Sequence, residues 1–353
     1  YRRQRQMCIR DRGSDVAAHS AGVLDIRTNI LADTDALYLT AIDKYGHELW
    51  RWTFPVEKLN QQSEPISFLS IRPTYTETEN DLIVKANKRT FIFSKKDGQL
   101  KGVSVDNRKI SFANGPRFIG ARRADRSLDQ FYNHDDEKAK EKDRTYSEFP
   151  DAAVFTKLDV KQDGGDLIVT ANYKLGNLDK AQWTINPSGD LALDYTYNFS
   201  GVVDLMGIRF DYPEDQVISK RWLGAGPYRV WQNRIHGTQY DIWENDYNDP
   251  IPGETFTYPE FKGYFGNVSW MNIQTKEGTI SLTNETPDTY IGVYQPRDGR
   301  DRLLYTLPES GISVLNVIPP VRNKVNSTDL CGPSSQPKWV NGPQTGRVIF
   351  RFM

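Results

Sequence analysis

The sequence predicts an all-β protein whose main part is a large antiparallel sandwich. Short apolar runs recur along the chain, and turns rich in Gly, Pro, Asn and Asp separate them. In residues 191–199 Leu, Tyr and Phe alternate with mostly polar residues, which is typical of a strand with one buried face. Strands do not alternate with long helical segments, so a sandwich is favoured over a βα fold.

Two strands are expected first, at residues 36–41 and 49–54, on either side of a Tyr45-Gly46 turn. Two Trp residues and one Phe in the second run share one face, because side chains in a strand alternate. We interpret residues 14–60 as the last strands of a small sandwich whose beginning is missing.

Residues 61–79 are polar, contain two prolines and are predicted to be a linker. The main unit is expected to span residues 80–353, beginning with a hairpin around Asp97-Gly98. Further strands are predicted at these positions: 153–160, 167–173, 191–199, 203–212, 279–283, 291–294, 312–318 and 348–352.

The first residues resemble no folded segment. Met7-Cys8-Ile9-Arg10-Asp11 is what a transposase sequencing adapter encodes when it is translated, and a basic tail is the alternative reading. We therefore expect residues 1–13 to be an adapter artefact and leave them out of the fold.

Composition excludes several classes of protein. The chain has 45 basic and 46 acidic residues, so it carries no surplus of positive charge for a nucleic-acid partner. No apolar run approaches the roughly 18 residues that a membrane helix needs. With only Cys8 and Cys331 present, a disulfide scaffold is excluded. Aromatic residues make up 12%, which suits a carbohydrate partner because Tyr and Trp stack on sugar rings.

The most specific motif is Trp222-Leu223-Gly224-Ala225-Gly226-Pro227, followed by Trp231 and Arg234. It resembles the pattern W-L-G-x-G-P-x-x-x-[YW]-x-x-R in the C-terminal, small-chain region of glycoside hydrolase family 2 β-galactosidases. Residues 88–100 and 258–263 resemble further stretches of that region. The resemblance covers about residues 80–353, with a fainter echo in 24–56.

The resemblance implies a galactose mutarotase-like supersandwich over residues 80–353, preceded by a truncated Ig-like β-sandwich. It also implies a parent enzyme, a retaining exoglycosidase whose two catalytic Glu residues lie on a TIM barrel. Such a barrel needs roughly 250 residues and has no place in this chain. The chain is therefore expected to be an inactive C-terminal fragment with no catalytic residue, which completes the wall of the active site.

Six residues are candidates for substrate binding in that wall. Aromatic, acidic and amide side chains suit a sugar, because rings stack on its face and polar groups bond its hydroxyls. The alternatives are a polar loop with ordinary Asx turns around residues 243–249 and a structural use of the signature residues. Gln336 lies nearest the position where the family has a Trp that stacks on sugar, which weakens any assignment to lactose. The candidates are Trp231, Arg234, Trp243, Glu244, Asp246 and Gln336.

No cofactor and no metal site is expected in this chain, although the parent enzyme could bind a divalent or sodium ion. The expected partners are a β-galactoside-like carbohydrate, the remaining domains of the parent enzyme and further copies of the chain. A bacterial enzyme, periplasmic or secreted rather than cytoplasmic, is favoured.

Two other functions stay open. One is a stand-alone carbohydrate-binding module. The other is an aldose mutarotase-like enzyme, which needs a His acid and a carboxylate base facing one sugar. Only His236 with Glu244 or Glu260 offers that pair.

Overall fold

The chain divides into two compact units, Tyr1–Gln61 and Gln62–Met353. The computed structural model describes residues 16–17, 19–23, 34, 36–56, 72–123, 146–246, 263–293, 308–309, 311–320 and 333–353. The expected adapter segment 1–13 lies outside these residues. No described helix is long and apolar enough to cross a membrane.

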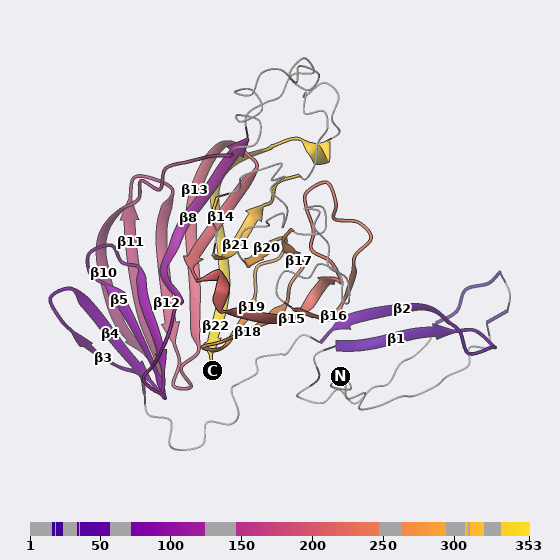
Figure 1. Cartoon of the computed structure of the whole chain (residues 1–353), viewed down its shortest axis with the longest axis horizontal. Coiled ribbons are helices and arrows are strands. Elements are labelled where there is room, and N and C mark those ends of the chain that lie inside the picture. Colours follow the sequence, from indigo (N-terminus) through magenta and orange to yellow (C-terminus); the bar gives the residue numbers. More distant parts are fainter. Residues whose placement is uncertain are drawn as a thin grey trace, which may run out of the picture. The chain divides into compact units, whose positions relative to one another are not determined.

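In the first unit, two antiparallel strands form a small sheet (Figure 1), β1 at Ala36–Ile42 and β2 at Glu48–Pro55. The expected aromatic face of the second strand is present and open to solvent. Trp50, Trp52 and Phe54 are 53%, 44% and 47% exposed. An apolar face of this kind normally packs against another layer.

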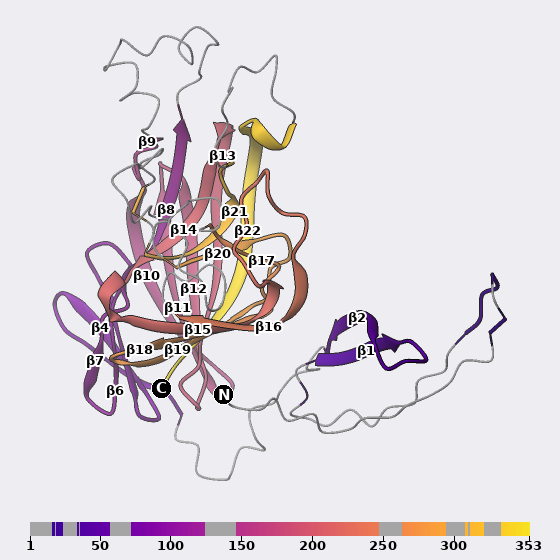
Figure 2. The ribbon, with the colours of Figure 1, turned by 45° about the vertical axis from the view of Figure 1, so that its right-hand side comes forward.

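The second unit contains two large antiparallel sheets (Figures 1 and 2). The predicted all-β fold with large antiparallel sheets is thereby confirmed. The nine-stranded sheet has, in spatial order, the strands β10 (Val154–Asp163), β11 (Asp166–Lys174), β12 (Leu178–Ile185), β13 (Leu191–Val203), β22 (Lys338–Phe352), β19 (Gly278–Asn284), β18 (Trp270–Thr275), β15 (Val217–Gly226) and β16 (Gln239–Asp246).

The second sheet has eleven strands. Nine follow one path, while β7 (Arg108–Ile110) pairs with β6 and β9 (Tyr146–Glu148) pairs with β8. The path runs through β17 (Phe265–Gly266), β20 (Tyr290–Val293), β21 (Ile312–Val317), β14 (Leu205–Asp211), β8 (Ala113–Arg123), β6 (Leu100–Val105), β5 (Arg89–Ser94), β4 (Asp81–Ala86) and β3 (Thr74–Glu77). Two short 3-10 turns complete the described elements, at Glu214–Gln216 and Pro333–Ser335.

The core lies between the two sheets and is rich in aromatic rings. Phe210 of β14 packs edge-on against Phe350 of β22, with ring centroids 5.4 Å apart. Phe93 of β5 meets Trp183 of β12 at 6.0 Å. All four side chains are fully buried. Burying such rings removes a large apolar area from water, which is the main term that holds the sheets together.

The alternation at residues 191–199 predicts the structure well. Leu191, Leu193, Tyr195, Tyr197 and Phe199 all point into the core and are at most 8% exposed. The strand continues to Val203 and pairs with β12 on one side and β22 on the other.

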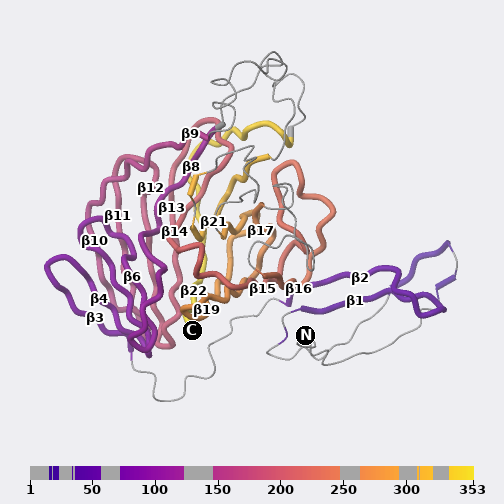
Figure 3. The backbone as a smooth tube through the Cα atoms, in the orientation of Figure 1, coloured from indigo at the N-terminus to yellow at the C-terminus, as the bar shows by residue number. Residues whose placement is uncertain are grey.

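Two expectations differ from the structure. Residues 74–77, inside the predicted linker, form β3 and pair with β4, so the second unit starts before residue 80. The last strand is predicted at 348–352 but begins at Lys338. Its first half lacks an apolar alternation, because the residues toward the inner face include two glycines and a glutamine at 342, 346 and 344. This half pairs with β13 along its whole length, and the backbone of β22 can be followed in Figure 3.

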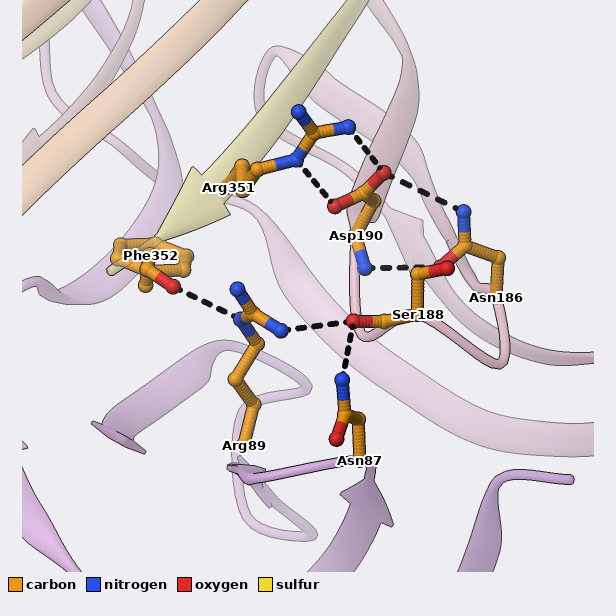
Figure 4. A network of polar contacts seen from close by, with 7 residues as sticks. All are labelled: Asn87, Arg89, Asn186, Ser188, Asp190, Arg351 and Phe352. Atoms are coloured by element: carbon orange, nitrogen blue, oxygen red, sulfur yellow. Dashed lines mark hydrogen bonds and ion pairs between the residues drawn. The ribbon is translucent and has the colours of Figure 1, made fainter. Parts of the chain in front are cut away.

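A polar network joins the two sheets at one end of the core (Figure 4). Arg89 of β5 donates to the main-chain oxygens of Phe352 (2.8 Å) and Ser188 (2.7 Å), both in the other layer. Next to it, Asp190 accepts two hydrogen bonds from Arg351, at 2.7 and 2.6 Å. Asp190 is only 8% exposed, so its charge depends on this two-pronged pairing.

Replacing Asp190 by Ala is expected to lower the free energy of unfolding by about 2 kcal/mol, because the Arg351 guanidinium loses its charge-assisted partner. Urea denaturation measures the effect. The matched control is Asp159→Ala, which removes an exposed pair with Lys157 and should cost less than about 0.5 kcal/mol. Equal losses in the two variants would contradict the role given to the network.

The network also predicts a pH dependence of stability. Burial raises the pKa of Asp190, but hydrogen bonds and charge from Arg351, with Asn186 and Arg89, outweigh it and hold the pKa below its ordinary 3.8. A lowered pKa stabilises the fold fully above the ordinary value, and this contribution is lost as the pH falls through the folded-state pKa.

The difference in unfolding free energy between the wild type and Asp190→Asn should therefore be constant near neutral pH and shrink as the pH drops below 3.8. Urea titrations at a series of pH values test this. A difference that grows on acidification would overturn it.

Candidate functional site

The signature motif lies at one edge of the nine-stranded sheet. Its first part, Trp222–Gly226, is the end of β15, and β16 returns beside it as the edge strand. Residues 227–238 connect these two strands. The motif therefore ends in a long connection at the open edge of the sandwich, where its side chains can reach solvent.

Trp222 is structural. Its side chain is fully buried, and its indole Nε1 donates to the main-chain oxygen of Ala225 at 2.9 Å. The indole packs edge-on against Phe265, with ring centroids 4.9 Å apart. All of its polar and apolar surface is used inside the protein, so it holds the motif in place.

Trp231, a predicted substrate-binding residue, is 2% exposed. It packs edge-on against Tyr264 at 5.7 Å, and Val230 beside it exchanges two main-chain hydrogen bonds with Tyr264. The side chain thus anchors the connection to the strand β17 region. Any influence on a sugar would pass through the turn that Trp231 fixes, since its ring is covered.

That turn runs from Trp231 to Arg234, whose main chains form an isolated bridge. The Arg234 N–H donates to the Trp231 oxygen at 2.8 Å. Arg234 itself is exposed. The structure therefore presents the second predicted residue to solvent directly beside the buried first one.

Gln232, which the sequence did not single out, joins this turn to a distant segment. Its side-chain Nε2 donates to the main-chain oxygen of Gln336 at 2.8 Å, and its N–H donates to Pro319 at 3.0 Å. Gln232 is 7% exposed, and its Oε1 has no hydrogen-bond partner among the residues that the structure describes. A buried acceptor without a partner is costly, and a water or a ligand hydroxyl would satisfy it.

Trp231, Arg234 and Gln336 are therefore brought to one place by Gln232, although 104 positions separate Gln232 from Gln336. No local pattern signals this contact. Gln232 is a polar residue between Trp231 and the exposed end of the turn. Its burial results from the tertiary structure.

The other three candidates lie on β16, not in a loop. Trp243 is half-buried opposite Trp222, and its Nε1 donates to the Gln239 oxygen at 3.2 Å. Glu244 and Asp246 are exposed and point to the opposite face, because neighbours in a strand alternate. The indole and the two carboxylates therefore do not form a single platform. Residues 247–249, the rest of that predicted cluster, lie outside the described residues.

Two buried cations near the motif were also missed. Lys220 is 1% and Arg229 is 3% exposed, and both lie over the ring of Phe265, at 5.9 and 5.8 Å from its centroid. The face of an aromatic ring attracts a cation, and this attraction is stronger when the cation is buried away from water. A signal existed for Lys220, since it stands two positions before Trp222 and so shares its inward face.

Within the described part of the chain, no three His, Cys, Asp or Glu side chains gather as a metal site would. The ion that the parent enzyme could bind is therefore assigned to no described residue. His236 is exposed in the connection before β16. Glu260, one of its two possible partners in a mutarotase-like reaction, lies outside the described residues.

Comparison with known protein families identifies the family of this chain. The family model described as beta galactosidase small chain matches residues 85–318, from β4 to just past β21, with the signature inside. This chain belongs to the beta-galactosidase small-chain family. The resemblance inferred from the signature motif is thereby confirmed.

No curated protein matches the sequence. Among solved structures, a galactose 1-epimerase from Lactobacillus acidophilus NCFM is 9% identical, with 80% of this chain and 99% of that chain covered and a TM-score of 0.41. An aldose epimerase homologue from C. elegans is 7% identical, with 80% and 99% covered and a TM-score of 0.35. An amine oxidase from Aspergillus nidulans is 8% identical, with 85% and 55% covered and a TM-score of 0.33. These low TM-scores assign no activity to this member of the small-chain family.

Gly226, in the signature of this small-chain domain, has a role that can be tested. A Cβ at this position would lie 2.4 Å from Cδ1 of Trp243, so the indole occupies the space that a side chain would need. Gly226→Ala should therefore lower the free energy of unfolding by about 1–3 kcal/mol through overpacking. Thermal unfolding with near-UV circular dichroism measures it.

The matched control is Gly102→Ala on β6, where an added Cβ meets nothing within 4 Å. Its effect should be within about 0.5 kcal/mol. A Gly226 variant as stable as this control would contradict the close contact with Trp243.

Proposed function

We propose that this chain is the C-terminal part of a β-galactosidase-like retaining exoglycosidase, in which it forms one wall of the active-site pocket and helps to bind the carbohydrate. The observation that carries the proposal is the signature turn. There a buried Gln232 carries an unpaired acceptor, Arg234 is exposed, and Gln336 is held beside them. A sugar hydroxyl is a donor that fits such an acceptor.

In this proposal each residue has a distinct part. The buried ring of Trp231 fixes the position of the turn, and the hydrogen bond from Gln232 to Gln336 joins the turn to the 333–336 segment. Arg234 contacts the substrate rim, where its guanidinium offers several N–H donors to hydroxyl oxygens. On β16, Glu244 and Asp246 form the outer rim on the exposed face, while Trp243, on the opposite face, supports the strand.

The chemical step is assigned to the rest of the parent enzyme. Retaining hydrolysis requires two carboxyl groups about 5–5.5 Å apart, one as nucleophile and one as acid and base. The family resemblance assigns both to Glu residues on a barrel. The chain alone is therefore proposed to be inactive, and the other domains are its main partners.

The first unit supports this larger architecture. Its aromatic face, formed by Trp50, Trp52 and Phe54, is about half exposed. A two-stranded sheet is marginally stable by itself and needs further strands over its apolar face. The proposal supplies them as the earlier strands of an Ig-like sandwich in the parent enzyme.

Sequencing of the gene upstream of codon 14 tests the architecture. An open frame encoding a (β/α)₈ barrel with two Glu residues at strand ends is the expected result. Hydrolysis of p-nitrophenyl β-D-galactopyranoside by the purified chain alone would sink the proposal, because the wall would then contain the catalytic groups.

In the full-length enzyme, Arg234→Ala should raise KM for p-nitrophenyl β-D-galactopyranoside about tenfold and leave kcat within about twofold, because a rim contact binds ground state and transition state alike. The matched control is Arg108→Ala, an exposed arginine at the start of β7, which should leave both constants unchanged. An unchanged KM in the Arg234 variant would remove this residue from the site.

A further inference from the structure

A second candidate site lies away from the signature, along the end of β13. Here the surface holds an open groove of about 440 Å³, within the usual range of small-ligand pockets. Phe149 and Pro150 form one wall, the turn at Gly176-Asn177 forms the next, and Phe199–Val202 form the third. We call it the edge groove. None of the signature residues lines it.

The edge groove exists because β12 leaves β13 early. Their pairing ends at Leu178 and Tyr197, and Asn177 closes the ladder with two hydrogen bonds to Asn198, at 2.7 and 2.8 Å. On its other side β13 stays paired with β22 as far as Val203. Beyond Asn198, none of the described strands pairs with the open edge.

The open edge offers main-chain hydrogen bonds to the groove. Asn198 directs its N–H and C=O toward Asn177. In a strand, every second residue directs its main-chain groups to the same side. Ser200 and Val202 therefore present one donor and one acceptor each along the groove.

At Gly176 two walls of the groove touch, namely the turn at Gly176-Asn177 and the segment that follows Pro150. Its φ of +64° lies in the left-handed region, and a Cβ there would come within 2.3 Å of the Ala153 nitrogen. The chain at 152–153 can pass this close only because residue 176 is glycine. At this point the wall of the groove is closely packed backbone.

An exposed indole lies on the outer face of the sheet, on the strand next to β13. Trp339 of β22 pairs with Val202, so the two side chains lie next to each other on one face of the sheet. Trp339 is 69% exposed, the largest exposure among the described Trp side chains. Two pairs further along, the Ser200 hydroxyl donates to Oδ1 of Asn341 at 3.0 Å, on the same face.

The surroundings of Trp339 favour a sugar over a protein partner. Protein interfaces have an apolar core of several side chains, depleted in polar residues. Here Ser200, Asn341 and exposed Lys338 are near neighbours in the sheet. One flat apolar surface with hydroxyl and amide groups at its rim matches the two aspects of a pyranose ring, its C–H face and its equatorial hydroxyls.

We propose that the edge groove and Trp339 form a binding site for a neutral glycan chain. Trp339 stacks on one pyranose ring on the outer face of the sheet, and Ser200 and Asn341 bond its hydroxyls. The glycan then continues over the open edge of β13 into the groove, where a further ring meets Phe149. The site is separate from the signature turn and does not depend on the function proposed for it.

Affinity electrophoresis of the full chain in native gels tests the proposal, with soluble β-1,4-galactan and xyloglucan as probes. The wild type should be retarded by at least one of them. Trp339→Ala should bind about tenfold more weakly, as expected for loss of one stacked ring, and Trp339→Phe should retain part of the retardation. Circular dichroism confirms that each variant is folded.

The matched control is Tyr75→Ala, since Tyr75 is 46% exposed on the edge strand β3 of the other sheet. It should bind like the wild type. Salt at 0.5 M shortens the range of charge–charge interactions to roughly half of its value at 0.1 M. Retardation that survives this salt therefore supports a neutral ligand, whereas its loss in salt overturns the proposal.

Two further outcomes also overturn it. One is an absence of retardation in both gels, or equal retardation of the wild type and Trp339→Ala. The other is a Trp339→Ala variant that changes the oligomeric state in size-exclusion chromatography without changing glycan binding, since the indole would then belong to a protein interface.

Discussion

The structure depends on where the C-terminal strand is inserted. In the nine-stranded sheet, β22 lies between β13 and β19 and pairs with both. On one side of it are β10 to β13, and on the other are β19, β18, β15 and β16. Among the described strands β22 alone joins these two halves, so the sheet is complete only when the fifteen residues of β22 are in place. Non-local pairing of this kind loses the conformational entropy of closing a long loop before the contacts that offset this loss have formed.

The same strand carries the tie between the layers. Its inner side chains, including Phe350 and Phe352, fill the core, while Arg351 on its outer face pairs with Asp190. Arg89 then reaches the main chain of Phe352 from the other sheet. Apolar burial supplies most of the stabilisation, and the polar network fixes the register in which the sheets meet, because its hydrogen bonds are directional.

The signature motif combines a buried framework and an exposed turn in one segment. Its two Trp residues at 222 and 231 are buried and make the framework, while Arg234, three positions after the second Trp, is exposed. Gln232 links this framework to Gln336. None of the signature residues lines the edge groove, so the two proposed sites use different surfaces of one sandwich.

The sequence by itself determined the all-β class, the one-sided strand at 191–199 and the family, because alternation and the signature are local properties of the chain. It also led to Trp231 and Arg234. Tertiary structure alone decided that Trp231 is covered and that Glu244 turns away from Trp243. It likewise decided that β22 begins at Lys338, since residues 338–347 lack an apolar alternation. Strand order and burial depend on partners far along the chain, and a local pattern carries no information about them.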